Sequence, residues 1–179
     1  NTYKLNIKTK LFYLVNTYDD ILNLITSNIL KKEKIFILGS GSNTLFTKNF
    51  DGLIIHPRIK GIKIENIENN YVFLNVACGE IWDDVVKYAV DNNYYGIENL
   101  SYIPGQAGSA PVQNIGAYGS ELKDIFFKLD AIDLYTGEIK TFYLDECNFS
   151  YRYSIFKEPE YKKYLITSIT IKLSLTESY

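Results

Sequence analysis

Two glycine-rich segments are the places where this backbone is best suited to bind a ligand. The first runs from Gly39 to Thr44, reads GSGSNT, and directly follows an apolar run. Glycines in such a loop let successive amide N–H groups turn toward an anion without interference from a Cβ atom. The segment lacks the third glycine of a GxGxxG fingerprint and the GK[ST] of a P-loop. It is interpreted as a phosphate-binding loop, with a plain turn as the alternative.

The second segment covers residues 103–119 and reads IPGQAGSAPVQNIGAYG, with four glycines and two prolines in seventeen positions. Small residues let the backbone approach a flat ligand closely, and Ser109, Gln113 and Asn114 offer hydrogen bonds at its edge. A tight structural loop is the alternative.

A third segment, residues 151–157, reads YRYSIFK and places Arg152 among aromatic and apolar neighbours. A guanidinium in such surroundings is costly unless it has an anionic partner. Arg152 is therefore a candidate for binding a substrate carboxylate, and an arginine stacked on surface tyrosines is the alternative.

The composition of the chain limits the classes of partner that it is expected to bind. With 19 basic and 21 acidic residues the net charge is -2, which argues against nucleic acid or an anionic membrane as a partner. No apolar stretch reaches the ~20 residues that span a bilayer, so a cytoplasmic location is expected. Cys78 and Cys147 match no metal-ligand spacing, so no metal is expected and both thiols are interpreted as buried or idle. The single histidine, His56, is interpreted as an incidental surface residue.

Hydrophobic patterns place the first glycine segment in a small β-α-β unit. The spacing predicts a strand over 10–15, and Thr17 with Asp20 resembles a capping box that opens a helix. Apolar runs over 34–38 and 52–55 predict two more strands, so residues 1–56 are expected to form a first lobe with a parallel sheet. The helix is expected to turn these apolar side chains inward: Ile21, Leu22, Leu24, Ile25 and Ile29.

Residues 57–179 have the pattern of a second, mostly antiparallel lobe. A helix is predicted over 81–90, with Val85, Val86, Ala89 and Val90 at helical spacing. No flexible linker separates the lobes, so we expect an interface that clasps a ligand. Strands are predicted over 62–64, 71–77, 126–134, 138–143 and 165–173, with a hairpin turn at 135–137 and the last strand closing the sheet.

Taken together, the three segments resemble the UDP-N-acetylenolpyruvoylglucosamine reductase family. The opening Asn1-Thr2-Tyr3 resembles the family's N-T-F, GSGSN its phosphate loop, IPGxxGSAPVQNIGAYG its longest signature, and YRxSIFK its arginine segment. The resemblance implies an α+β fold, the two-lobed FAD-binding fold shared with vanillyl-alcohol oxidase and p-cresol methylhydroxylase, with the cofactor between the lobes.

The resemblance also implies a reaction. NADPH would reduce FAD, which would pass a hydride to UDP-N-acetylenolpyruvoylglucosamine and form UDP-N-acetylmuramate for peptidoglycan synthesis. FAD would be bound non-covalently, because His56 stands outside both glycine segments. Arg152 would be catalytic, stabilising an enolate-like charge on the substrate carboxylate. Tyr118 and Tyr151 would face the substrate with it.

The implied cofactor-binding residues are Gly39, Ser40, Gly41, Ser42, Asn43, Thr44, Gly105, Ser109, Pro111, Val112, Asn114, Gly116 and Ile166. The family's serine proton donor and glutamate belong to a substrate domain that is expected to be absent here, following Tyr179. The chain is therefore expected to bind FAD without being fully active. The alternative is a stand-alone flavin-binding module without turnover.

Overall fold

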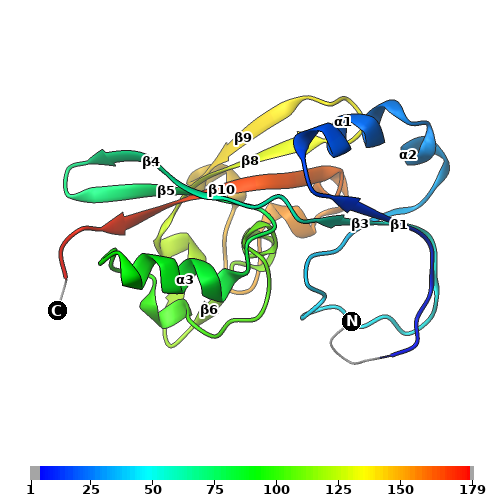
Figure 1. The fold of residues 1–179 in the computed structure, drawn as a ribbon. Coiled ribbons are helices and arrows are strands. Elements are labelled where there is room, and N and C mark those ends of the chain that lie inside the picture. The colour runs from blue at the N-terminus through cyan, green and yellow to red at the C-terminus, as the bar shows by residue number, and fades with distance from the viewer. Residues whose placement is uncertain (1–4, 178–179) are drawn as a thin grey trace.

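The computed structural model describes residues 5–177, so the opening Asn1-Thr2-Tyr3 lies outside the described residues. Two sheets dominate the fold, one of three strands and one of five, and a two-stranded ribbon accompanies them (Figure 1).

The three-stranded sheet is parallel throughout. It consists of β1 (Thr9–Val15), β2 (Ile35–Ile37) and β3 (Phe50–Pro57), in the order β1-β3-β2. Helices α1 (Tyr18–Thr26) and α2 (Ile29–Lys32) connect β1 to β2. The predicted β-α-β unit with a parallel sheet is confirmed. A loop without a helix connects β2 to β3, and this loop carries the first glycine segment.

Helix α1 begins at the predicted capping box. The Thr17 hydroxyl accepts a hydrogen bond from the Asp20 amide at 3.2 Å, and the Asp20 carboxylate accepts one from the Thr17 amide at 2.9 Å. The face of α1 that is buried in the core is narrower than predicted. Ile21 and Leu24 are buried, but Leu22 is 53% exposed, because it lies about 100° around the helix from its buried neighbour.

The helix ends before the last predicted inward residue. Ser27 caps α1, so Ile29 starts α2 and is only half-buried, whereas the next residue, Leu30, packs into the core.

Every pairing in the five-stranded sheet is antiparallel, and the five predicted strands and the hairpin turn are confirmed. The strand order is β4-β5-β10-β8-β9. The strand predicted to close the sheet, β10, lies instead at its centre (Figure 1), and its residues 165–171 are all buried because the sheet covers both its edges and other elements cover its faces. The strands are β4 (Ile62–Glu68), β5 (Tyr71–Ala77), β8 (Phe126–Asp133), β9 (Ile139–Tyr143) and β10 (Tyr164–Ser174).

Helix α3 (Trp82–Asp91) supplies Val85, Val86 and Ala89 to the core of this sheet, as predicted. Val90, also expected to pack, is 49% exposed, and Trp82 packs instead. The helix begins one residue later than predicted, and its buried stripe runs from Trp82 through Ala89.

Short elements complete the chain. The ribbon pairs β6 (Gly116–Ala117) with β7 (Ser120–Glu121). The 3-10 helices are η1 (Glu98–Leu100), η2 (Ala107–Ser109), η3 (Pro111–Gln113), η4 (Leu122–Asp124), η5 (Leu144–Cys147), η6 (Ile155–Lys157) and η7 (Pro159–Tyr161).

The two sheets share a hydrophobic core. Ile132, Leu134 and Leu165 of the larger sheet pack with Ile21 and Leu53 of the smaller unit. The smaller unit therefore buries its apolar side chains partly against the larger sheet. The lobe boundary at residue 56 stays a prediction, and β3 runs one residue past it.

Within residues 5–177, no helix has the length and apolar character to cross a membrane.

Candidate ligand-binding cleft

A cleft of about 590 Å³ brings the two glycine segments together, a volume typical of small-molecule sites. The Ser42 hydroxyl donates to the Pro104 carbonyl at 2.9 Å, and the Asn43 amide side chain donates to the Gln113 side-chain oxygen. These bonds join loops that are distant in sequence. Most of the predicted cofactor residues line the cleft: Gly39, Ser40, Gly41, Ser42, Asn43, Thr44, Gly105, Ser109, Val112 and Ile166.

The loop after β2 has the features of an anion site. Gly41 has a φ of 72°, in the left-handed region that glycine adopts without a steric penalty. Among residues 5–177, no carbonyl accepts the amides of Ser40, Ser42 or Asn43. Backbone amides that lack an acceptor in the protein are available to a bound anion.

The charge of the lining favours an anion as well. The ionisable residues that line the cleft include Lys157 and Lys162, and no carboxylate from the described part of the chain joins them. The ammonium of Lys157 donates to the Arg152 carbonyl at 2.6 Å, so its position is fixed. The cleft therefore offers a positive field together with unused N–H donors.

Ser109 and Gln106 form the wall opposite Gly39. The Ser109 hydroxyl donates to the Gln106 carbonyl at 2.8 Å and accepts from the Gln106 amide at 3.3 Å. Ser109 thus fixes the turn that begins η2. A Cβ atom added to Gly39 would lie 3.3 Å from the Ser109 hydroxyl oxygen, so the two residues face each other closely.

Three predicted cofactor residues, Pro111, Asn114 and Gly116, do not line the cleft. Asn114 is fully buried, and its side chain donates to the Ser150 carbonyl at 3.1 Å and accepts from the Lys123 amide at 3.0 Å. A Cβ atom on Gly116 would lie 2.7 Å from the Ser120 carbonyl oxygen. Pro111 is buried in the first turn of η3. In the structure, these three residues fix the conformation of a loop whose other residues line the cleft.

Arg152 lies outside the cleft but is tied to the long glycine segment. Its guanidinium donates to the carbonyls of Asn114 at 3.4 Å and Gly116 at 2.5 Å, which flank the cleft residue Ile115. It also lies 5.4 Å from the centre of the Tyr151 ring. No carboxylate of the described residues forms a salt bridge with it. Its charge is therefore positioned by carbonyl dipoles, and the nearby Glu121 carboxylate, which pairs with Lys123 at 2.8 Å, offsets it only in part.

The predicted substrate-facing tyrosines are on the surface. Tyr118 is 85% exposed and Tyr151 is 81% exposed. Asn114, Tyr118 and Arg152 all have φ values near +50°, which is uncommon for residues with side chains. Such strained conformations concentrate at functional sites.

Several cleft residues were not predicted from the sequence. Phe156 and Lys157 lie within the YRYSIFK segment, whose apolar and basic residues were a usable signal. Gln106 lies within the predicted segment 103–119. The others come from elements that only the tertiary fold brings here, and they include Trp82, Tyr161, Lys162 and Tyr164.

His56 and the cysteines have defined surroundings. His56 is half-buried on β3, where its Nδ1 lies 2.8 Å from the Leu38 carbonyl oxygen, so the interpretation as an incidental surface residue is wrong. Cys78 and Cys147 are buried, as expected. Burial raises the pKa of Cys78 to about 11 and that of Cys147 to about 12.

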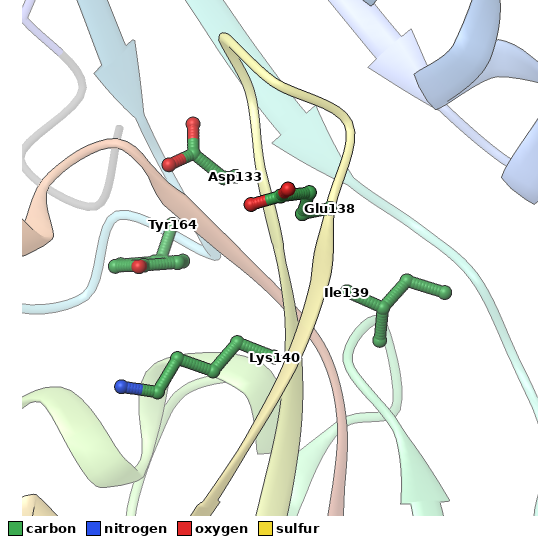
Figure 2. Close-up of a pocket in the computed structure, with 5 residues that line it drawn as sticks. All are labelled: Asp133, Glu138, Ile139, Lys140 and Tyr164. Carbon is green, nitrogen blue, oxygen red and sulfur yellow. The ribbon is translucent and has the colours of Figure 1, made fainter.

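A second hollow, of about 470 Å³, lies at the β8-β9 hairpin and is lined by Asp133, Glu138, Ile139, Lys140 and Tyr164 (Figure 2). Burial by itself would raise the pKa of Asp133, but hydrogen bonds from Lys163 and from the turn amides lower it overall. The Asp133 carboxylate is 2.7 Å from the Lys163 ammonium and accepts from the Tyr135 amide at 2.9 Å. The buried Asp133 carboxylate thus stabilises the hairpin turn.

Comparisons with known proteins agree with this geometry. Residues 9–143 match the family described as the FAD binding domain. The chain is 45% identical over 97% of its length to a UDP-N-acetylenolpyruvoylglucosamine reductase of Flavobacterium johnsoniae, and 41% identical over 100% to one of Porphyromonas gingivalis. It covers 51% and 53% of these proteins, so it spans about half of their length. The resemblance inferred from the three segments is confirmed.

Solved structures support the fold. UDP-N-acetylenolpyruvylglucosamine reductase from Thermus caldophilus is 20% identical with a TM-score of 0.73, over 91% of this chain and 55% of that one. The 6-hydroxy-D-nicotine oxidase from Arthrobacter nicotinovorans is 16% identical with a TM-score of 0.65, over 96% of this chain and 38% of that one. The predicted α+β FAD-binding fold is confirmed. Because the family match extends over most of the chain, the chain belongs to the FAD binding domain family.

Proposed function

We propose that this chain is the FAD-binding part of a UDP-N-acetylenolpyruvoylglucosamine reductase. The complete enzyme would act in the cytoplasm, use NADPH, and form UDP-N-acetylmuramate for peptidoglycan synthesis. The observation that carries the proposal is the identity to reductases of that name along essentially the whole chain. The cleft adds support, because it unites the two glycine segments on which the resemblance rests.

The cleft residues fit FAD. Its pyrophosphate carries negative charge, which suits the ammonium of Lys162 and the amides of Ser40, Ser42 and Asn43, for which residues 5–177 offer no carbonyl acceptor. The flat rings of the cofactor suit apolar walls, and Val112 and Ile166 belong to these walls. His56 is the single histidine of the sequence and does not line the cleft, which supports non-covalent binding of FAD.

Arg152 is the residue we propose for the substrate carboxylate. When bound, FAD supplies hydride transfer from NADPH to the enolpyruvyl double bond. Arg152 would hold the carboxylate and stabilise the enolate-like charge that the transfer leaves on it. Its guanidinium suits this role because it is held by two carbonyls and forms no salt bridge with a carboxylate among residues 5–177. Donors fixed before the reaction need no reorganisation when charge develops.

The exposed rings of Tyr118 and Tyr151 would contact the same substrate, because Tyr151 stacks near the Arg152 guanidinium. The proton donor would lie in the part of the relatives that this chain does not match. The chain by itself is therefore expected to bind FAD but to turn over the substrate poorly.

Titration of the purified chain with FAD tests the first half of the proposal. The protein should become yellow, bind FAD at micromolar concentration or below, and release all flavin on acid precipitation. Flavin that stays attached to the polypeptide would contradict non-covalent binding. Absence of binding would overturn the proposal altogether.

The second half needs the complete reading frame that encodes this chain. Its product should oxidise NADPH when UDP-N-acetylenolpyruvoylglucosamine is added, and the isolated chain should do so far more slowly. A complete protein that binds FAD but never consumes NADPH with this substrate would favour the alternative, a flavin-binding module without turnover.

A further inference from the structure

The side-chain amide of Gln106 is an unusual group in this cleft. Gln106 lines the cleft and is only 6% exposed. Its Nε2 donates to the carbonyls of Pro57 at 3.1 Å and Gly79 at 3.3 Å. Its Oε1 is buried and has no hydrogen-bond partner among residues 5–177. Buried polar atoms nearly always have a partner, so this oxygen needs an explanation.

The orientation of the amide follows from its neighbours. The Pro57 and Gly79 carbonyl oxygens both require a donor, and only the NH₂ group of the side chain provides one. A flipped amide would press its oxygen against two other oxygens. The NH₂ group therefore faces the two carbonyls, and Oε1 is the atom that Gln106 presents on its other side.

No group of residues 5–177 donates a hydrogen bond to Oε1 from that side. Gly39 lies close to this atom, because a Cβ atom added there would lie 3.2 Å from Oε1. The nearby Ser109 hydroxyl already donates its single proton to the Gln106 carbonyl. Gly39, without a Cβ atom, allows this close approach to the oriented acceptor. Because Gln106 lines the cleft, an occupant of the cleft is the candidate donor.

We propose that Gln106 Oε1 accepts a hydrogen bond from a sugar-alcohol hydroxyl of FAD. This inference rests on the proposed binding of FAD in the cleft. The pyrophosphate is excluded as the partner, because its ionised oxygens carry no proton to donate. Gln106 faces Gly39, the first residue of the loop that suits the pyrophosphate. The donors next to a pyrophosphate in FAD are the hydroxyls of the ribityl chain on one side and of the ribose on the other.

Substitution of Gln106 tests the contact from the protein side. Gln106→Met keeps the length of the side chain and removes the acceptor, so FAD affinity should fall roughly 2- to 10-fold, the range of one hydrogen bond. Asn75→Leu is the matched control. Asn75 is also a part-buried amide whose Nδ2 donates to two groups, the hydroxyls of Ser168 and Thr170, but it does not line the cleft. FAD affinity should be unchanged in this control.

Gln106→Met also removes the bonds to Pro57 and Gly79, so thermal unfolding of the apoprotein is recorded with each titration. If the variant does not fold, the contact is tested by changing the ligand and keeping the wild-type protein. FAD with a deoxyribityl chain and FAD with a deoxyribose are titrated beside FAD itself. One of the two should bind wild-type protein roughly 2- to 10-fold more weakly than FAD, and the one affected identifies the hydroxyl.

The Gln106→Met variant and the FAD analogues together form a double-mutant cycle, in which one change is made in the protein and the other in the ligand. If Gln106 and the hydroxyl are partners, a folded Gln106→Met variant should bind FAD and the affected analogue equally. Wild-type protein that binds FAD and both analogues with the same affinity would overturn the inference and leave the proposed function intact. Wild-type protein that does not bind FAD would overturn both.

Discussion

Arg152 carries a charge that two carbonyls position and that no carboxylate of the described residues pairs with directly. In the complete enzyme, Arg152→Ala should slow reoxidation of the reduced flavin by substrate by about 10²- to 10³-fold, the usual cost of losing one preorganised donor. Arg152→Lys should be nearly as slow, because an ammonium cannot bind both carboxylate oxygens as a planar fork does. Anaerobic stopped-flow absorbance follows the step directly.

Reduction of the flavin by NADPH is the control for this prediction and should stay near the wild-type rate in both Arg152 variants. Normal reoxidation together with lost FAD binding would give Arg152 a structural role. That outcome has a physical basis in the structure, because Arg152 holds the carbonyls of Asn114 and Gly116.

Two glycines of the predicted site should behave differently on substitution. At Gly116, an alanine Cβ would lie 2.7 Å from a backbone oxygen, so Gly116→Ala should destabilise the apoprotein by about 1–3 kcal/mol. At Gly39, the closest contacts would be 3.2 and 3.3 Å, to the side chains of Gln106 and Ser109. Gly39→Ala should therefore weaken FAD binding more than it weakens the fold.

Urea unfolding of the apoproteins and FAD titration separate these effects. The sequence predicts Gly116 as a cofactor contact, and the structure adds a reason for glycine there that needs no cofactor. A Gly116→Ala protein as stable as wild type would contradict the close approach to Ser120.

At the scale of elements, helix α3 places a natural reporter in the cleft. Trp82 is the only tryptophan of the chain and begins α3. It is 1% exposed, donates from its indole nitrogen to the Leu100 carbonyl at 2.9 Å, and lines the cleft. Its fluorescence should be quenched as FAD binds, because the flavin absorbs where tryptophan emits. Quenching should saturate at one FAD per chain.

The same titration with a flavin-free nucleotide such as ADP is the control and should leave most of the emission. Emission that persists at saturating FAD would mean that the flavin lies far from α3. The cleft would then not be the cofactor site.

The central position of β10 explains how the elements form one site. This strand pairs with β5 and β8 and carries Tyr164 and Ile166 into the cleft. The segment before it, which includes Lys157 and Lys162, is thereby brought opposite the loop after β2. A strand at the edge of the sheet would not place these residues between the two sheets.

For the whole molecule, the buried thiols predict a loss of stability at alkaline pH. Their folded pKa values, about 11 and about 12, lie above the ordinary value of 9.0. Below pH 9 the thiols are protonated in both states and have no effect. Above pH 9 the unfolded thiols ionise first, so the free energy of unfolding should fall as pH rises toward 11. The slope is at most about 1.4 kcal/mol per pH unit for each thiol.

Urea unfolding at several values between pH 8 and pH 10.5 measures this slope. A Cys78→Ala/Cys147→Ala double variant should show a shallower decline over the same range, whatever its stability at pH 8. Equal slopes would mean that the two thiols ionise as readily in the folded protein as in the unfolded chain.

Features that depend on neighbours along the chain can be predicted from the residues alone. The capping box of Thr17 and Asp20, the hairpin turn at 135–137 and the strand patterns all arise from local geometry, and the structure contains each of them. The glycine loop of 39–44 belongs to this class too, because a φ of 72° at Gly41 reflects what glycine allows in a short turn.

Long-range packing sets which faces of these elements are buried and which distant atoms come into contact. Leu22 and Val90 fit helical periodicity but face solvent, because no other element covers them. The unpartnered oxygen of Gln106 depends on carbonyls of Pro57 and Gly79, which lie far away in sequence. Such contacts follow from the packing of the two sheets, and local pattern contains no information about them. Local chemistry drew attention to the two glycine segments, whereas long-range packing built the cleft that they line.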